Sequence, residues 1–261
     1  MRILITGKNG YVGKSVYNYF NNNWDKTYPS FFTAIGRDDF DLTDRNETNN
    51  YFFKYGYFDV VIHTAICGGS RLKKDSDKVI SDNLKMFYNL LANRNRFGQL
   101  ISFGSGMELN NPDSPYGLSK NIIWDIIKHD PKLNNIRIFG VFDENEWDTR
   151  FIKTCIKNYK NKKPLLIHQD KLFDFFYMKD LFKVIEFIIS NPQIKKIDCV
   201  YKEHYRLTEI ADYINTLDEH YSEIKIQEKK LGSPYTGYFV DYKLNLMGLK
   251  NGIKEIYDKA N

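Results

Sequence analysis

A short apolar strand that runs directly into a glycine-rich turn opens the chain and constrains its fold more than any other stretch. The expected order is a strand at residues 3–5, a turn containing Gly7, Gly10 and Gly13, and a helix over residues 11–24. Gly7 permits a tight turn, Gly10 allows close approach of a ligand to the backbone, and Gly13 lets the helix pack on the strand. The N-terminus of the helix then favours a pyrophosphate group. The spacing is G-x-x-G-x-x-G rather than the commoner G-x-G-x-x-G, and glycines alone could simply mark a turn.

Strands and helices are expected to alternate along the first part of the chain. The strands are expected at 3–5, 31–35, 60–63, 99–103 and 136–139, and the helices at 11–24, 46–54, 78–93, around Tyr116 and at 150–159. This alternation predicts an α/β fold with a doubly wound parallel sheet, helices on both faces, and ligands beyond the carboxyl ends of the strands. Residues at or just past these ends are Gly7, Gly36, Thr64, Ser105 and Gly140.

Tyr116 and Lys120 place a phenol and an ammonium one turn apart on the same face of a helix. A nearby lysine charge stabilises a phenolate, so Tyr116 could transfer a proton near neutral pH. The same spacing occurs at Tyr159/Lys163 and Tyr221/Lys225. Only Tyr116 follows a helix-starting proline and a buried strand that ends at Ser105. Tyr116 and Lys120 are therefore predicted to be catalytic, and the other pairs are expected to be solvated helix faces.

Several motifs, taken in order, resemble those of one protein family. They are the three glycines, the strand end at 63–65, Ser105, residues 115–120, the Asp-Phe-x-Tyr segment at 174–181, and residues 246–249 before a last helix. Together they are similar to the extended short-chain dehydrogenase/reductases, which are nucleotide-sugar epimerases, dehydratases and reductases. The resemblance implies a Rossmann NAD(P)-binding domain at residues 1–163. Residues 164–261 would be a mixed region that completes the sheet and forms a small substrate-binding cap.

The resemblance also implies roles for individual residues. The catalytic residues would be Ser105, Tyr116 and Lys120, with Ser102 as an alternative to Ser105. The residues that bind the cofactor would be Gly7, Asn9, Gly10, Tyr11, Val12, Gly13, Gly36, Arg37, Asp41, Leu42, Thr64, Ala65, Ile66, Asn83, Phe103, Tyr116, Lys120, Phe139 and Val141. The residues that bind the substrate, a nucleotide sugar, would be Gly69, Ser105, Gly140, Arg150 and Lys157.

The residues after the second strand bear on the choice of cofactor. An acidic residue there binds the adenosine ribose of NAD, whereas an arginine accommodates the phosphate of NADP. Arg37 occupies this region, and Lys8 in the glycine turn would add a second cation. NADP is therefore the preferred cofactor. NAD is the alternative, with Asp38 or Asp39 at its ribose.

Departures from the family narrow the expected chemistry. Nucleotide-sugar 4,6-dehydratases carry Asp-Glu directly after the catalytic Thr or Ser, whereas Ser105 is followed by Gly-Met. Residues 64–69 are similar to a turn of GDP-fucose synthase, but Met107 and Arg150 replace the Cys and His that epimerise its substrate. Phe173 stands where many relatives have an Arg that grips the substrate phosphates. Three hypotheses remain: a keto-sugar reductase, a redox-neutral 4-epimerase with tightly bound NAD, and a non-catalytic cofactor-binding protein.

Composition excludes other classes of function. The net charge is +5 and acidic residues are interspersed among the basic ones, so nucleic-acid binding is not expected. Three separated cysteines indicate reduced thiols without a metal site, and the lack of a long apolar run indicates no membrane span. A cytoplasmic location is expected. The apolar residues of the Tyr116 helix leave a homodimer possible, although simple packing on the sheet is an equal alternative.

Overall fold

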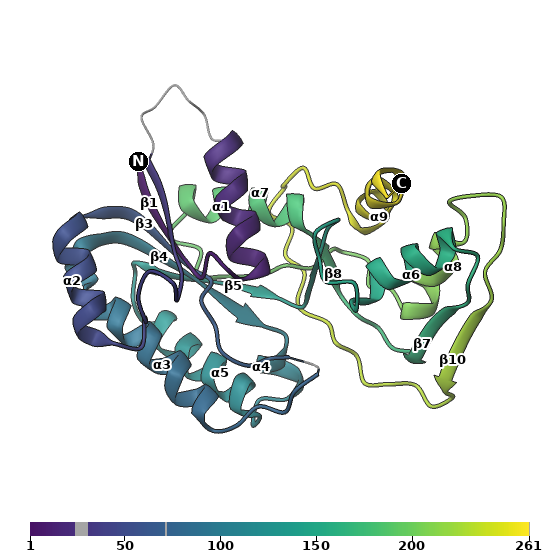
Figure 1. Ribbon diagram of the computed structural model, residues 1–261, viewed down its shortest axis with the longest axis horizontal. Helices are drawn as coiled ribbons and strands as arrows, with labels where there is room; N and C mark the ends of the chain where they lie inside the picture. The colour runs from purple at the N-terminus through teal and green to yellow at the C-terminus, as the bar shows by residue number, and fades with distance from the viewer. Residues whose placement is uncertain (24–30, 71, 261) are drawn as a thin grey trace. The chain divides into compact units, whose positions relative to one another are not determined.

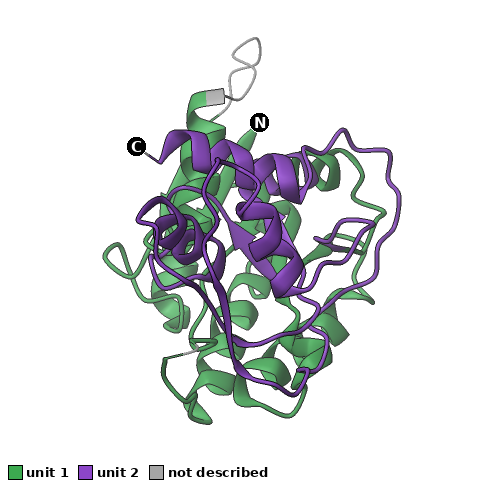
Figure 2. Ribbon diagram, turned by 90° about the vertical axis from the view of Figure 1, so that its right-hand side faces the viewer, with its two compact units in different colours: residues 1–137, 185–197 green, residues 138–184, 198–261 purple. Residues whose placement is uncertain are grey.

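A computed structural model describes residues 1–23, 31–70 and 72–260 (Figure 1). These residues form two compact units, coloured separately in Figure 2. The first contains residues 1–137 and 185–197, and the second contains residues 138–184 and 198–261. The expected division after residue 163, into a cofactor-binding domain and a mixed region that completes the sheet and forms a cap, stays a prediction.

The first unit is built around a six-stranded sheet with the order β2-β1-β3-β4-β5-β9. Its strands are β1 (Arg2–Thr6), β2 (Phe31–Ile35), β3 (Phe58–His63), β4 (Phe97–Ser105), β5 (Leu133–Ile138) and β9 (Lys196–Asp198). The β1 strand pairs in parallel with β2 and β3, and β3 pairs in parallel with β4. The chain goes from β1 to β2 on one side and returns to β3 on the other. This reversal makes the carboxyl ends of β1 and β3 the switch point at which ligands bind in such sheets.

Helices cover both faces of this sheet, as predicted, because its central strands are apolar almost throughout. Residues 3–6 of β1 and 60–63 of β3 are all buried, which is typical of parallel strands. The helices of this unit are α1 (Tyr11–Asn23), α2 (Arg45–Tyr55), α3 (Lys78–Leu91), α4 (Met107–Asn110) and α5 (Pro115–Ile127), with a 3₁₀ turn at Arg94–Arg96. In Figure 1, α1 lies on one face and α3 and α5 lie on the other. Trp24, the expected last residue of α1, lies outside the described residues.

Local sequence signals explain where two of these helices begin. Asp44 caps α2, since its carboxylate accepts hydrogen bonds from the backbone N–H groups of Asn46 and Glu47. Ser114 caps α5 in the same way through the N–H of Gly117, and Pro115 occupies the first turn, where it costs no hydrogen bond. The cap fixes the start of the helix that carries the predicted tyrosine and lysine.

The second unit contains shorter elements and two small parallel sheets, β6–β8 and β7–β10. Its elements are β6 (Gly140–Phe142), α6 (Phe151–Lys160), β7 (Leu165–Gln169), β8 (Phe175–Tyr177), the first half of α7 (Met178–Ser190), α8 (Leu207–Ile214), β10 (Ile224–Glu228) and α9 (Leu249–Lys259). The strand expected at 136–139 ends at Ile138, and β6 then begins the first small sheet. Buried apolar residues of α6, α8 and α9 form one core with β7 and β8.

The Asp-Phe-x-Tyr segment holds the C-terminal part of the second unit in place. The carboxylate of Asp180 accepts hydrogen bonds from the N–H groups of Met247 and Gly248 at 2.8 and 3.0 Å and from the Tyr201 hydroxyl at 2.7 Å. Asp174 likewise accepts one from the N–H of Gly237 at 2.8 Å. Both carboxylates therefore fix irregular backbone of residues 237–248, so this part of the segment has a structural role.

Candidate active site

The glycine turn after β1 lies directly against the loop that follows β3. Gly7 has a φ of +84°, and a Cβ on it would lie 2.6 Å from the backbone nitrogen of Ala65. A Cβ on Gly13 would lie 2.5 Å from the hydroxyl oxygen of Thr64. The N–H of Lys14 donates to the carbonyl of Gly10, which opens the helix. Only glycine fits at residues 7 and 13, and the first turn of α1, including Tyr11 and Val12, starts at this turn.

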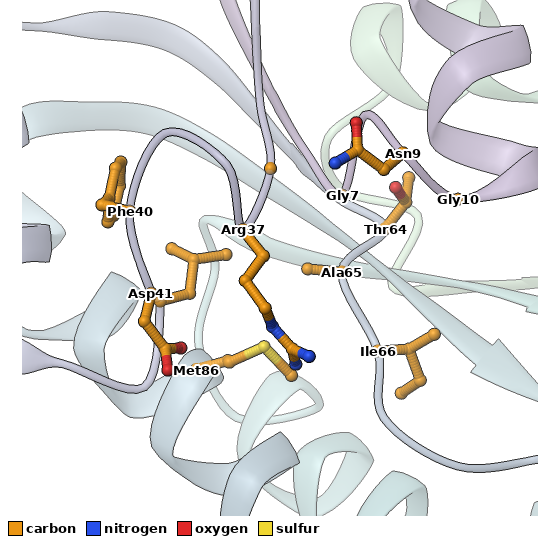
Figure 3. Close-up of a pocket in the computed structure, with 12 residues that line it drawn as sticks. Gly7, Asn9, Gly10, Arg37, Phe40, Asp41, Thr64, Ala65, Ile66 and Met86 are labelled. Carbon is orange, nitrogen blue, oxygen red and sulfur yellow. The ribbon is translucent and has the colours of Figure 1, made fainter.

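A cavity of about 280 Å³ opens beside this turn, within the first unit (Figure 3). Ten residues predicted to bind a cofactor line it: Gly7, Asn9, Gly10, Gly36, Arg37, Asp41, Leu42, Thr64, Ala65 and Ile66. Phe40 and Met86 also line it, although they were not predicted. Phe40 lies between two predicted residues, and Met86 follows Asn83 by one turn of α3, so loop continuity and helical spacing could have indicated both.

The charged residues at this cavity have different environments. Lys8 forms ion pairs with Asp38 at 3.0 Å and with Asp39 at 2.6 Å. The Arg37 side chain instead extends through the cavity and ends next to Met86 (Figure 3). A nitrogen of its guanidinium lies 3.8 Å from the sulfur of Cys67. The charge of Lys8 is therefore balanced locally, whereas Arg37 presents its guanidinium inside the cavity.

Ser105 is the last residue of β4, and two contacts fix it. Its backbone N–H donates to the carboxylate of Glu108 at 2.8 Å, and its hydroxyl oxygen accepts the N–H of Met107 at 3.2 Å. Accepting this hydrogen bond occupies only a lone pair of the hydroxyl oxygen, so the O–H can still donate to a ligand. The hydroxyl of Ser102, the alternative residue, is buried without a hydrogen-bond partner among the described residues.

Tyr116 and Lys120 both lie on α5, as predicted. The Lys120 ammonium is buried, donates to the carbonyl oxygen of Phe103 at 2.5 Å and lies 5.7 Å from the centre of the Tyr116 ring. Burial lowers the pKa of Lys120 to about 8, and the Glu108 carboxylate opposes this shift. A Cβ on Gly69 would lie 2.9 Å from the ring of Tyr116, so the loop after β3 lies close against the phenol.

The two other tyrosine–lysine pairs have different structures. Tyr159 is buried, its hydroxyl is within hydrogen-bond distance of three backbone carbonyls, and Lys163 follows the end of α6. Tyr221 is 71% exposed and precedes β10 rather than lying on a helix. The expectation of solvated helix faces is therefore wrong for both: Tyr159 is part of a core, and Tyr221 lies on an irregular stretch.

Asn83, another predicted cofactor residue, supports the loop after β3. Its side-chain oxygen accepts the N–H of Cys67 at 2.8 Å, and its side-chain nitrogen lies within hydrogen-bond distance of the Cys67 carbonyl and the Ser119 hydroxyl. Since Ser119 is on α5, this amide connects the loop between β3 and α3 with the helix that carries Tyr116.

Five predicted residues belong to the second unit, namely Phe139, Gly140, Val141, Arg150 and Lys157. Gly140 lies close to Phe173, since a Cβ on it would be 2.8 Å from that ring. Arg150 is the N-cap residue of α6, where it faces solvent only in part. Lys157 pairs with Asp148 at 3.2 Å on the surface. Phe173 and Gly140 thus lie together in an apolar part of the second unit.

Comparison with known proteins identifies the family. A model of the NAD dependent epimerase/dehydratase family matches residues 3–202. The chain belongs to this family. It is an enzyme of the extended short-chain dehydrogenase/reductase type that uses a nicotinamide cofactor, as its motifs predicted.

Three similar proteins share little sequence identity with this chain, and the two solved structures among them share its fold. CDP-abequose synthase of Yersinia pseudotuberculosis is 22% identical over 73% of this chain and 74% of its own length. A dTDP-4-dehydrorhamnose reductase of Clostridium acetobutylicum is 20% identical, with a TM-score of 0.81 over 99% of both chains. GDP-mannoheptose C4 reductase of Campylobacter jejuni, with NADP bound, is 14% identical, with a TM-score of 0.78 over 98% of this chain and 97% of that one.

The first unit of this chain has a geometry that fits a bound dinucleotide. The turn at Gly7 and Gly13 has no room for side chains, and the start of α1 offers backbone N–H groups for a pyrophosphate. The cavity beside this turn would take the adenosine end of the cofactor.

Among the described residues, no helix is long and apolar enough to cross a membrane. The same residues contain no group of three or more His, Cys, Asp or Glu that could hold a metal ion.

Proposed function

We propose that this enzyme is an NADPH-dependent reductase of a keto group on a nucleotide-linked sugar. The observation that carries the proposal is the Arg37 guanidinium inside the cavity, because a planar cation there suits the phosphate that distinguishes NADP from NAD. Asp38 and Asp39, which would favour NAD, are engaged by Lys8 instead. Two of the similar proteins are named as reductases, one of them with NADP bound.

The catalytic residues would act on the carbonyl oxygen of the sugar. The bound cofactor supplies a hydride for the carbonyl carbon. Ser105 donates a hydrogen bond to the carbonyl oxygen, and Tyr116 transfers its proton to that oxygen. The Lys120 ammonium, 5.7 Å from the ring centre, stabilises the phenolate that remains. Proton and hydride together convert the ketone to an alcohol.

The residues around Ser105 support reduction over dehydration or 3,5-epimerisation. Eliminating water needs an acid and a base of its own, but Gly106 and Met107 follow Ser105. Neither the thioether of Met107 nor the guanidinium of Arg150, which offers only hydrogen-bond donors, can abstract a carbon-bound proton. Reduction requires only the side chains of Ser105, Tyr116 and Lys120, which this chain retains.

The decisive experiment is a binding titration of the purified protein with NADPH, NADP, NADH and NAD, after any copurified cofactor has been identified. Exchangeable binding that is selective for the phosphate supports the reductase. Tightly held NAD would contradict it and favour the redox-neutral 4-epimerase. The next assay is oxidation of NADPH with 4-keto sugars linked to CDP, dTDP or GDP, since the similar proteins act on sugars of these three nucleotides.

A further inference from the structure

A buried carboxylate lies behind the proposed catalytic residues. Glu108 is on the short helix α4, and its side chain is only 1% exposed. Its oxygens contact the backbone N–H of Ser105 at 2.8 Å and the guanidinium of Arg137 at 3.4 Å. Burying an ionisable group in this way is costly, so the structure must gain something specific from it.

The first contact fixes the end of β4. Ser105 and Glu108 bond reciprocally around the start of α4, because the serine hydroxyl accepts the N–H of Met107 while the glutamate accepts the N–H of Ser105. This arrangement resembles a capping box. Gly104 makes room for it, since a Cβ there would lie 2.6 Å from the side chain of Asn135 and closer still to the carboxylate of Glu108. Glu108 therefore determines how Ser105 presents its hydroxyl.

The second effect is electrostatic. Burial raises the pKa of Glu108, and the hydrogen bond from the Ser105 N–H opposes this rise, as do the charges of Arg137, Lys120 and Lys196. The influence is mutual, because the carboxylate of Glu108 favours the charged form of Lys120. Burial and the charge of Lys120 lower the pKa of His63 to about 3, so His63 is neutral near pH 7. The interaction with Glu108 is thus what opposes the effect of burial on Lys120.

We infer that Glu108 is a positioning residue, whose buried carboxylate holds Ser105 in place at the end of β4 and acts on Lys120 through its charge. The inference rests on the catalytic roles proposed above for Ser105 and Lys120. Glu108 touches neither cofactor nor sugar in this account, and it acts only through these two residues. A purely structural capping role would require the hydrogen bond to Ser105 but not the negative charge.

The test compares Glu108→Gln, which keeps the shape but removes the charge, with Glu108→Asp, which keeps the charge. Carbon-13 NMR of protein with labelled lysine follows the ionisation of Lys120, whose signal is assigned by its loss in Lys120→Arg. In Glu108→Gln the pKa of Lys120 should fall below its wild-type value of about 8, because the opposing carboxylate charge is lost. Glu108→Asp should stay near the wild type. An unchanged pKa in folded Glu108→Gln would overturn the inference.

A control variant and a direct measurement of Glu108 ionisation complete the test. Glu186→Gln is the matched control, because that carboxylate accepts a hydrogen bond from Tyr19 instead, and it should leave the Lys120 titration unchanged. If Glu108→Gln does not fold, carbon-13 NMR of the Glu108 carboxyl carbon in labelled wild-type protein shows whether this group is ionised. A protonated Glu108 at pH 7 would contradict the inference, and an ionised one would support it.

Kinetics distinguish this inference from the proposed function. With an accepted keto sugar, Glu108→Gln should lower kcat more than it raises KM, and the alkaline limb of the kcat profile should move to lower pH. If the wild type reduces no sugar, the proposed function fails. The NMR titration needs neither sugar nor cofactor, so it judges the effect of Glu108 on Lys120 independently.

Discussion

The ammonium of Lys120 donates a hydrogen bond to the carbonyl oxygen of Phe103, two residues before Ser105 on the same strand. One strand therefore positions two of the three proposed catalytic groups, Ser105 at its end and Lys120 through its backbone. Tyr116 lies one helical turn before Lys120 on α5, close to the capped start of this helix. The three groups are held by regular structure of a single compact unit, which suits a site that must be rigid.

Tyr116→Phe should lower kcat by roughly 100-fold or more, because the hydroxyl that transfers the proton is lost. The ring remains, and so does its contact with Gly69, so cofactor affinity should change little. Steady-state rates and a binding titration measure the two effects separately. Tyr221→Phe is the matched control, since Tyr221 has the same spacing to a lysine but is 71% exposed, and it should retain full activity.

Lys120 should make the stability of the protein depend on pH. Its pKa falls from 10.5 to about 8 on folding because of burial, so the folded state disfavours the charged form. The penalty is present in full below pH 8 and disappears as the pH rises toward 10.5. Relative to Lys120→Met, the wild type should gain about 3 kcal/mol of unfolding free energy over this range. Urea unfolding at several pH values measures the difference, and a constant difference would contradict the assignment.

The two glycines of the turn should respond differently to alanine. Gly13→Ala should destabilise the protein by about 2 kcal/mol, because the new Cβ collides with Gly7 and Thr64. Gly10→Ala should destabilise the protein less, since the nearest atom to the new Cβ, the Gly7 carbonyl oxygen, would be 3.3 Å away, but it should weaken cofactor binding. Thermal unfolding and a cofactor titration separate the two effects. Equal loss of stability in both variants would contradict this account of the turn.

The sequence predicted those features that depend on neighbouring residues. The glycine turn, the strand ends at Thr64 and Ser105, and the helix start at Pro115 all follow from local patterns, and the structure contains each. The strand order could not be predicted in the same way, because the pairing of β1 with both β2 and β3 joins residues about 30 and 60 positions apart.

Side-chain partners were harder to predict than elements. The pairing of Lys8 with Asp38 and Asp39 depends on how two loops meet, so the sequence could only offer all three as candidates for the cofactor. The sequence did not predict Glu108 as part of the site, because the pattern Ser-x-x-Glu at residues 105–108 indicates only the start of a helix. Its burial beside Arg137 depends on packing between strand and helix, which no short pattern contains.

Arg37→Ala should distinguish the two nicotinamide cofactors. Loss of a charged hydrogen bond to the phosphate should weaken NADPH binding by about 10- to 100-fold, whereas NADH binding should stay nearly constant. Lys8→Ala is the matched control, because the charge of Lys8 is already balanced by Asp38 and Asp39. It should retain the preference for NADPH. If Lys8→Ala removes the preference and Arg37→Ala does not, the phosphate is held at the glycine turn rather than in the cavity. If neither changes it, Arg37 is a loop charge, and the case for the reductase loses its main support.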